Sequence, residues 1–217
     1  MESLPPAVLV HVVDDDAAVR TALARLLASD GHAVECFESA DAFLSRRDPR
    51  AHGCLVLDIA MPGLNGLALQ HALVDNGCHL PIVFLSGAAD VPLCIEAMKL
   101  GAFDFLTKPV DDTVLLQAVA RALDRDLAVE EALARRTATE GLLATLTPRE
   151  NEVLAHVMAG RLNKQIAGDL GIAEKTIKVH RARGMEKMHV RSVAELVRLV
   201  ERAKLALEDA GRHPAAA

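Results

Sequence analysis

The chain has 217 residues, enough for one or two domains that each bury a core, and its 51% hydrophobic content excludes long-range disorder. Five Phe with neither Trp nor Tyr argue against a protein that stacks single-stranded nucleic acid on aromatic rings. The net charge of −6 is unevenly distributed: residues 1–126 carry 9 basic and 18 acidic side chains, whereas residues 127–217 carry 15 basic and 12 acidic ones. Within 160–191 there are 8 basic and 3 acidic side chains. This basic stretch is compatible with binding to a phosphate backbone.

Strand and helix patterns alternate through the first 125 residues. Helical spacing of apolar residues occurs around Val19–Leu27, in Gly66–Asn76 and in Asp90–Leu100, each followed or closed by a glycine. Apolar runs typical of buried strands lie between them: Val8–Val13, Ala33–Phe37, Leu55–Asp58, Ile82–Ser86 and Asp104–Thr107. The alternation predicts an α/β fold, a doubly wound five-stranded parallel sheet.

Polar and charged residues stand where four of these apolar runs end. Asp14 and Asp15 follow the first run, Asp58 ends the third, Ser86 ends the fourth and Lys108 follows the fifth. The carboxyl ends of parallel strands meet at one edge of a sheet, so these side chains should share one crevice. Crowded carboxylates favour a divalent cation, and a lysine beside them favours an anion such as a phosphoryl group.

From Asp112 a helical pattern continues into a charged, Ala-rich stretch, and we expect a helical linker over 126–144. A second domain, over 145–210, begins at Thr147-Pro148-Arg149-Glu150, a capping box with Pro in the first turn. Asn163 is expected to cap a second helix that ends at Gly171. A third helix should run from near Ala173 to about Met188, and a fourth should begin near Ser192. This all-α four-helix unit would contain a helix-turn-helix, and we expect residues 211–217 to form a disordered tail.

Several motifs occur together in a fixed order: VVDDD, LDIAMPGLNG, IVFLSG, GAFDFLTKP and LTPRE…NKQIAGDLGIAEKTIKVH. Through them residues 1–125 resemble a receiver domain with a flavodoxin/CheY-like fold, and the second domain resembles a LuxR-type DNA-binding module. The whole chain is thus similar to two-component response regulators of the FixJ/NarL type.

For the first domain the resemblance implies a phosphoacceptor, Asp58, and a Mg²⁺ ion held by Asp14, Asp15, Asp58 and the backbone carbonyl of Ala60. Lys108 and Ser86 would contact the phosphoryl group, and Ser86 would move together with the switch aromatic, Phe105. Pro109 suits a fixed bend that aims Lys108 inward, and a cis peptide bond is an option there. A dimer face is implied on the helix expected over Asp90–Leu100, at Val91, Ile95 and Met98.

For the second domain the resemblance implies that Lys178 and Val179 reach base edges in the major groove. Phosphate contacts are expected from Lys164, Thr176, His180, Arg181 and Lys187, with a further, less typical DNA contact from Arg183. Gly184 stands where relatives commonly have a bulky apolar residue. We therefore expect a less stable end of this helix, and a gain in stability on Gly184→Ile.

These features predict a transcription factor that a sensor histidine kinase phosphorylates, and that then forms a homodimer on promoter DNA. RNA polymerase would be a further partner, and no enzymatic activity beyond slow self-dephosphorylation is expected. Two alternatives remain: a phosphate sink or relay, and a DNA-binding protein that works without phosphorylation. No apolar run has the length of a membrane span, and no leader is visible. The four cysteines have no metal-ligand spacing, which is typical of reduced thiols. We therefore expect a cytoplasmic protein with no membrane partner.

Overall fold

The computed structural model describes residues 8–48, 52–87 and 91–211, which divide into two compact units between Val129 and Glu130. The N-terminal unit holds a parallel sheet with the strand order β2-β1-β3-β4-β5. Its elements in chain order are β1 Val8–Val13, α1 Ala17–Ser29, β2 Ala33–Phe37, α2 Ala40–Arg46, β3 His52–Asp58, α3 Gly66–Asp75, β4 Ile82–Ser86, α4 Val91–Lys99, β5 Asp104–Thr107 and the start of α5 Asp112–Ala144. The doubly wound parallel sheet expected from the alternation is confirmed.

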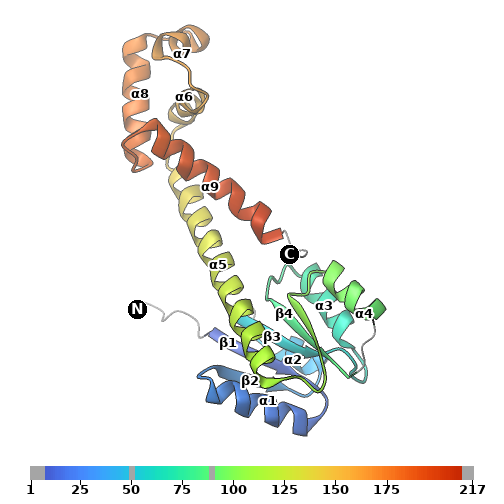
Figure 1. Ribbon diagram of the computed structural model, residues 1–217. Coiled ribbons are helices and arrows are strands. Elements are labelled where there is room, and N and C mark those ends of the chain that lie inside the picture. Colours follow the sequence, from blue (N-terminus) through green and yellow to red (C-terminus); the bar gives the residue numbers. More distant parts are fainter. Residues whose placement is uncertain (1–7, 49–51, 88–90, 212–217) are drawn as a thin grey trace. The chain divides into compact units, whose positions relative to one another are not determined.

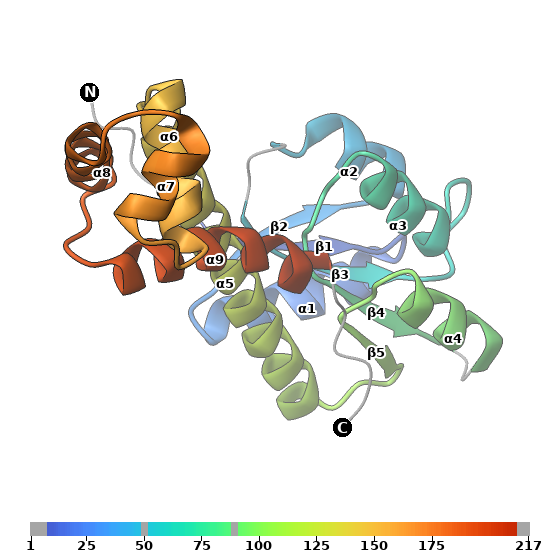
Figure 2. The same ribbon diagram turned by 90° about the horizontal axis from the view of Figure 1, so that it is seen from above.

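Two apolar layers sandwich the sheet, and Figures 1 and 2 show helices on both of its faces. One face packs against α2, α3 and α4 through residues such as Phe43, Leu69 and Ala97. The other face packs against α1 and α5 through residues such as Leu27 and Leu115. Because alternate strand residues point to opposite faces, a continuously apolar strand such as β4 serves both layers.

Some boundaries differ from the sequence expectation. The short helix α2 was not anticipated; its seven residues are too few for a clear apolar period, and its start is set by Ser39, whose Oγ accepts from the Ala42 N–H at 3.1 Å. Strand β3 begins at His52, three residues before the predicted start. The predicted helix start at Asp90 lies outside the described residues, and α4 is described from Val91.

Helix α5 is continuous for 33 residues and contains the whole of the predicted linker, 126–144. Two ion pairs at i,i+4 spacing lie along this part of the helix, Glu131 with Arg135 and Arg136 with Glu140. Such pairs stabilise a solvated helix by a few tenths of a kcal/mol each, about 0.2–0.5. No described helix is long and apolar enough to cross a membrane.

The C-terminal unit contains α6 Pro148–Met158, α7 Asn163–Leu170, α8 Glu174–Lys187 and α9 Val193–Gly211. The capping box is present, since Thr147 Oγ1 accepts from the Glu150 N–H and Glu150 Oε2 accepts from the Thr147 N–H. The four-helix arrangement is confirmed (Figure 2). Gly211, the first residue of the predicted tail, ends α9, and 212–217 lie outside the described residues.

The predicted cap of α7 is wrong by one residue. Leu162 occupies the N-cap position, and its N–H donates to Gln165 Oε1 at 2.9 Å. Because the side chain of Gln165 accepts this N–H at the start of α7, the side chain of Asn163 is available to another partner. Ile177 packs with Ile166 in one apolar cluster, and Met188 packs with Leu196 on α9 in a second.

The expectation that Gly184 leaves space for a larger side chain is also wrong. Gly184 is buried where α8 crosses α6, and a Cβ atom there would lie 2.9 Å from Leu154 Cδ1 and 3.0 Å from its Cγ. Leu154 is itself buried in the second apolar cluster, so it has little room to yield. Glycine at this position allows two helices to pack closely rather than leaving a cavity.

Gly184→Ala should therefore destabilise the C-terminal unit by about 1–2 kcal/mol, because overpacking against Leu154 outweighs the better helix propensity of Ala. Differential scanning calorimetry of the full chain measures this as a lower melting temperature, and Gly184→Ile should lower it further. Gly168→Ala in α7 is the matched control: no atom lies within 4 Å of its Cβ position, so stability should rise. A gain from both alanines would contradict close packing at Gly184.

A buried histidine lies on β1, an inner strand of the sheet. His11 on β1 is 1% exposed, and its ring centroid lies 5.5 Å from that of Phe43 and 6.0 Å from that of Phe37. Burial, with a smaller contribution from the positive charge of Arg47, lowers the pKa of His11 to about 4. The folded protein therefore holds a neutral imidazole that the unfolded chain, at a pKa of 6.5, would protonate below neutral pH.

The N-terminal unit should lose stability as the pH falls from about 6.5 to about 4, because the unfolded state binds the extra proton throughout this window. The loss is on the order of 3 kcal/mol, and it is absent above the upper limit. Urea denaturation followed by circular dichroism at a series of pH values measures it. His11→Leu should flatten the dependence in this window; parallel curves for the two proteins would contradict the assignment.

Candidate functional site

The carboxyl edge of the sheet brings together the residues that end the strands. Asp14 follows β1, Asp58 ends β3, Ser86 ends β4 and Lys108 follows β5. Backbone hydrogen bonds beyond the regular ladder hold these ends in place: the Asp14 N–H donates to Phe37 O at 3.3 Å and the Lys108 N–H donates to Ser86 O at 2.7 Å. The crevice expected from the strand ends is therefore formed.

Three carboxylates converge in this crevice. Ligand oxygens of Asp14, Asp15 and Asp58 all lie within 4.8 Å of one another. Asp14 and Asp58 are buried, at 1% and 7% exposure, whereas Asp15 is exposed and opens the cluster to solvent. Hard carboxylate oxygens in an open cluster fit Mg²⁺, which binds one or two carboxylates and keeps several waters. The chemistry of the donor set thus fits the expected cation.

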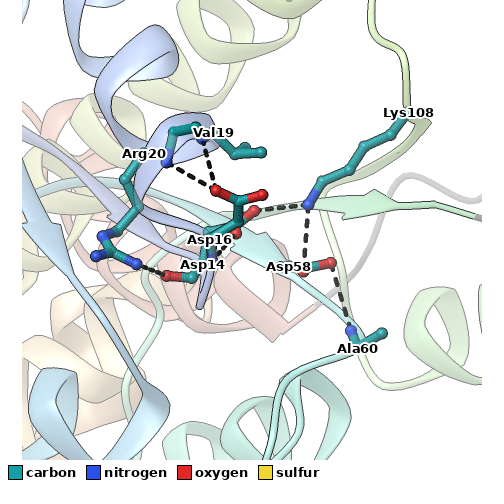
Figure 3. A network of polar contacts seen from close by, with 8 residues as sticks. Asp14, Asp16, Val19, Arg20, Asp58, Ala60 and Lys108 are labelled. Carbon is teal, nitrogen blue, oxygen red and sulfur yellow. Dashed lines mark hydrogen bonds and ion pairs between the residues drawn. The ribbon is translucent and has the colours of Figure 1, made fainter.

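Lys108 is the counterion of this cluster (Figure 3). Its Nζ lies 2.6 Å from Asp14 Oδ2 and 3.2 Å from Asp58 Oδ2. Burial acts against the charged form, but the hydrogen bonds and negative charges of Asp14 and Asp58 outweigh it and raise the pKa of Lys108. The site therefore combines three carboxylates with one ammonium, a net charge of about −2 that a divalent cation would balance.

The β1–α1 turn is fixed by residues that the site prediction omitted. Asp16 caps α1, and its Oδ1 accepts from the Ala18 N–H at 2.7 Å, while its own N–H donates to Asp14 Oδ1 at 2.8 Å. Arg20 Nη1 donates to the backbone oxygen of Asp14 at 2.6 Å (Figure 3). An aspartate directly before a helix is a readable capping signal, whereas nothing in the sequence pattern indicates the bond from Arg20.

The β3–α3 turn carries the predicted carbonyl ligand, Ala60. The Ala60 N–H lies 3.4 Å from Asp58 Oδ1, so the residue is in the immediate surroundings of the carboxylate. The turn is closed by Gly66, whose N–H donates to Ile59 O at 3.1 Å. A Cβ atom on Gly66 would lie 2.5 Å from Asp58 O, so only glycine fits here.

Ser86 and Phe105 lie on neighbouring strands. Ser86 is 3% exposed at the end of β4, and Phe105 is half-buried on β5. The rings of Phe105 and Phe84 have centroids 6.3 Å apart, and Phe84 is paired with Phe105 in the sheet register. The Lys108–Pro109 peptide bond is cis.

The predicted dimer residues lie along α4. Val91 begins the helix, Ile95 is 49% exposed, and Met98 is half-buried against the core. Ile95 also lines a groove together with His71 of α3, Pro92 and Lys99. An exposed isoleucine on a helix surface is a feature that contact with another molecule would explain.

The predicted DNA-contacting residues lie on α7 and α8, and most are accessible. Lys164, Thr176, Lys178, Val179 and Arg183 are exposed, whereas His180, Arg181 and Lys187 are half-buried. Lys178 forms an ion pair with Glu174 one turn earlier, with Nζ 3.1 Å from Oε1, yet its side chain remains 63% exposed. An exposed pair of this kind contributes little to stability, so Lys178 can exchange Glu174 for another partner.

Lys187 also makes contacts within its own unit. Its Nζ donates to Glu150 Oε2 at 2.6 Å and to Thr145 O at 3.0 Å, which ties the end of α8 to the start of α6. Hydrogen bonds from the Lys187 ammonium and from the Thr147 N–H lower the pKa of Glu150 to about 2. Lys187 therefore contributes to the packing of this unit, and its contact with DNA phosphate stays a prediction.

Comparisons with known proteins agree with this arrangement. Residues 10–120 match the response regulator receiver domain, and residues 144–200 match the bacterial regulatory proteins of the luxR family. The transcriptional regulatory protein FixJ of Azorhizobium caulinodans is 44% identical over 206 residues, covering 95% of this chain and 98% of its own length. FixJ of Rhizobium meliloti is 42% identical, covering 88% and 93%.

Solved structures show the same similarity. The response regulator StyR is 46% identical with a TM-score of 0.82, covering 90% of this chain and 99% of its own. Full-length FixJ from B. japonicum is 40% identical with a TM-score of 0.57, covering 92% and 98%.

Removal of the ammonium should tighten Mg²⁺ binding. Lys108→Ala takes away a positive charge that competes for Asp14 and Asp58, so we expect Mg²⁺ to bind about 3–10-fold more tightly. Asp14→Asn should weaken it about tenfold or more, because a buried ligand charge is lost. Isothermal titration calorimetry measures both, with Lys99→Ala, an exposed lysine of α4, as the control without effect. Weaker binding by Lys108→Ala would contradict the competition.

Proposed function

The chain belongs to the response regulators that join a receiver domain to a LuxR-type DNA-binding domain, and we propose that phosphorylation of Asp58 controls its binding to promoter DNA. Proteins of this architecture are transcription factors, and a receiver domain implies a histidine kinase as the partner that supplies the phosphoryl group. The observation that carries the proposal is the convergence of Asp14, Asp15, Asp58 and Lys108 at one edge of the sheet.

Asp58 is the nucleophile in this proposal. One of its carboxylate oxygens attacks the phosphorus of a phosphohistidine; the P–O bond forms as the P–N bond breaks, and the electron pair of that bond returns to the imidazole. Catalysis of phosphoryl transfer consists mainly of positioning and charge stabilisation, because the transition state is loose. A bound Mg²⁺ would supply charge stabilisation at the phosphoryl oxygens. Asp14, Asp15, Asp58 and the Ala60 carbonyl would hold it.

Lys108 and Ser86 recognise the phosphoryl group. Lys108 already faces Asp58, so its ammonium can move from the carboxylate to a phosphoryl oxygen over a short distance. Ser86, at the end of the neighbouring strand, donates a hydrogen bond to a second oxygen. These charge-assisted bonds favour the arrangement of β4 and β5 in which Ser86 lies closer to Asp58.

The change at Ser86 is relayed to the α4 surface through Phe105. The Phe105 ring turns inward as Ser86 moves, and the surface that contains Val91, Ile95 and Met98 then pairs with the same surface of a second copy. The exposed Ile95 supports this location of the dimer contact. A dimer brings two C-terminal units together, so that they can bind two half-sites of a promoter.

On DNA, α8 is the recognition helix. Lys178 and Val179 contact base edges. The residues that contact or lie near phosphates are Lys164, Thr176, His180, Arg181, Arg183 and Lys187. An excess of basic residues in 160–191, 8 against 3 acidic, supports this interface. RNA polymerase is a further partner of a DNA-bound dimer.

The two alternative functions make different demands on the residues. A phosphate sink or relay needs only the N-terminal unit, and the exposed basic side chains of α8 argue against it. A DNA-binding protein that works without phosphorylation needs no acidic crevice, and the complete set of three carboxylates and Lys108 argues against it.

Phosphorylation and dimerisation should be separable. With acetyl phosphate and Mg²⁺ the wild-type chain should gain one phosphoryl group by mass spectrometry and become dimeric in analytical ultracentrifugation. Asp58→Asn should show neither change, because the nucleophile is lost. Ile95→Asp should gain the phosphoryl group but stay monomeric, since a charge on the contact surface opposes pairing.

Val74→Asp is the matched control for the dimer surface, because Val74 is also an exposed apolar residue, at 50%, but belongs to α3. This variant should dimerise like the wild type. Retention of the phosphoryl group by Asp58→Asn would refute the assignment of the nucleophile, and dimerisation of Ile95→Asp would refute the assignment of the surface.

A further inference from the structure

One hydrogen bond joins the two helices of the helix-turn-helix at their solvent edge. Arg181 Nη1 on α8 donates to Asn163 Oδ1 in the first turn of α7 at 3.2 Å. The two residues are 18 positions apart in the chain, so the bond depends on how α7 packs on α8 through Ile166 and Ile177. Asn163 is free to form it because Gln165, and not Asn163, closes the start of α7.

The bond restricts an arginine that lies beside the predicted base-reading residues. Arg181 follows Lys178 by three residues, so the two side chains leave the same side of α8 about one turn apart. Arg181 is half-buried, whereas Arg183, two residues further on, is exposed. Ala182, one turn after Lys178, offers only a methyl group, so Arg181 is the long side chain beside Lys178 on this side of α8.

A guanidinium has five N–H donors in a planar fork, and Asn163 uses only one of them. The remaining donors can bind a phosphate oxygen, and a guanidinium already held in one orientation loses less entropy when it does so. The amide of Asn163 is neutral, so it orients Arg181 without cancelling its charge. A carboxylate in this place would compete with the phosphate.

We propose that Asn163 is a positioning residue for DNA binding, which holds Arg181 so that its free N–H groups face one phosphate of the DNA backbone. The assignment rests on the proposed function, since it requires that α8 enters the major groove. It makes Asn163 contribute to affinity through Arg181, with no sequence preference of its own.

A double-mutant cycle on the full chain tests the proposal. Each variant is treated with Mg²⁺ and beryllium fluoride, and its binding to a duplex of arbitrary sequence is measured by fluorescence anisotropy over a range of salt concentrations. Arg181→Ala should weaken binding about 5–10-fold and reduce the slope of log K against log salt by about 0.9, the value for one phosphate contact.

Asn163→Ala should weaken binding about threefold in the wild-type background and leave it unchanged in the Arg181→Ala background. Arg183→Ala is the matched control: it is a nearby basic residue of the same helix without a bond to Asn163, so its effect should add to that of Asn163→Ala. Melting temperatures show whether each variant is folded; a merely structural role of Asn163 would lower them and weaken binding equally in both backgrounds.

The outcomes separate the two levels of the argument. Equal weakening by Asn163→Ala with and without Arg181, or no weakening at all, would overturn the positioning role and leave the proposed function intact. Failure of the wild-type chain to bind any duplex would overturn the proposed function and the positioning role together.

Discussion

The contact of Lys108 with Asp14 and Asp58 is the interaction on which the rest of the N-terminal unit depends. Buried carboxylates whose oxygens lie within 4.8 Å of one another repel strongly, and the ammonium that lies 2.6 Å from Asp14 offsets this repulsion. The same lysine is the group that a phosphoryl oxygen would bind. The ammonium of Lys108 would therefore have two alternative anionic partners. It pairs with the aspartates when no phosphoryl group is present, and it would pair with the phosphoryl group when one is bound.

Lysines at strand and helix ends can serve either chemistry or packing, and the local sequence does not distinguish them. Lys108 and Lys187 both lie within 3 Å of a buried carboxylate. Lys108 faces an open cluster of three acids, whereas Lys187 meets a single glutamate that also accepts the Thr147 N–H. The two lysines therefore differ in the number of acidic groups around them and in the access of those groups to solvent.

The elements that could be predicted from the sequence are those with a repeating apolar pattern. The residues that could be predicted are those that cap a helix or follow the end of a strand. Apolar runs located all five strands, and parallel-sheet geometry then placed Asp14, Asp58 and Lys108 together. The errors have different causes: α2 is too short for a clear period, the start of α7 is closed by the nearby Gln165, and other features depend on contacts between distant residues. Gly184 depends on Leu154, and the side chain of Asn163 depends on Arg181, and neither partner can be read from the surrounding sequence.

The path from the phosphoryl site to the α4 surface follows from the alternation of side chains along a strand. Ser86 and Phe84 are two residues apart on β4, so they point to the same face of the sheet, and Phe105 is the register partner of Phe84. Phe84 and Phe105 belong to the apolar layer that includes Ala97 and, at its edge, Met98. In the proposed function, a displacement of Ser86 toward Asp58 would change the space beside rings that pack under α4. Because this layer is close-packed, it adjusts between discrete arrangements rather than continuously, and about 5.5 kcal/mol of preference between two such arrangements would convert a rare dimer-competent state into the dominant one.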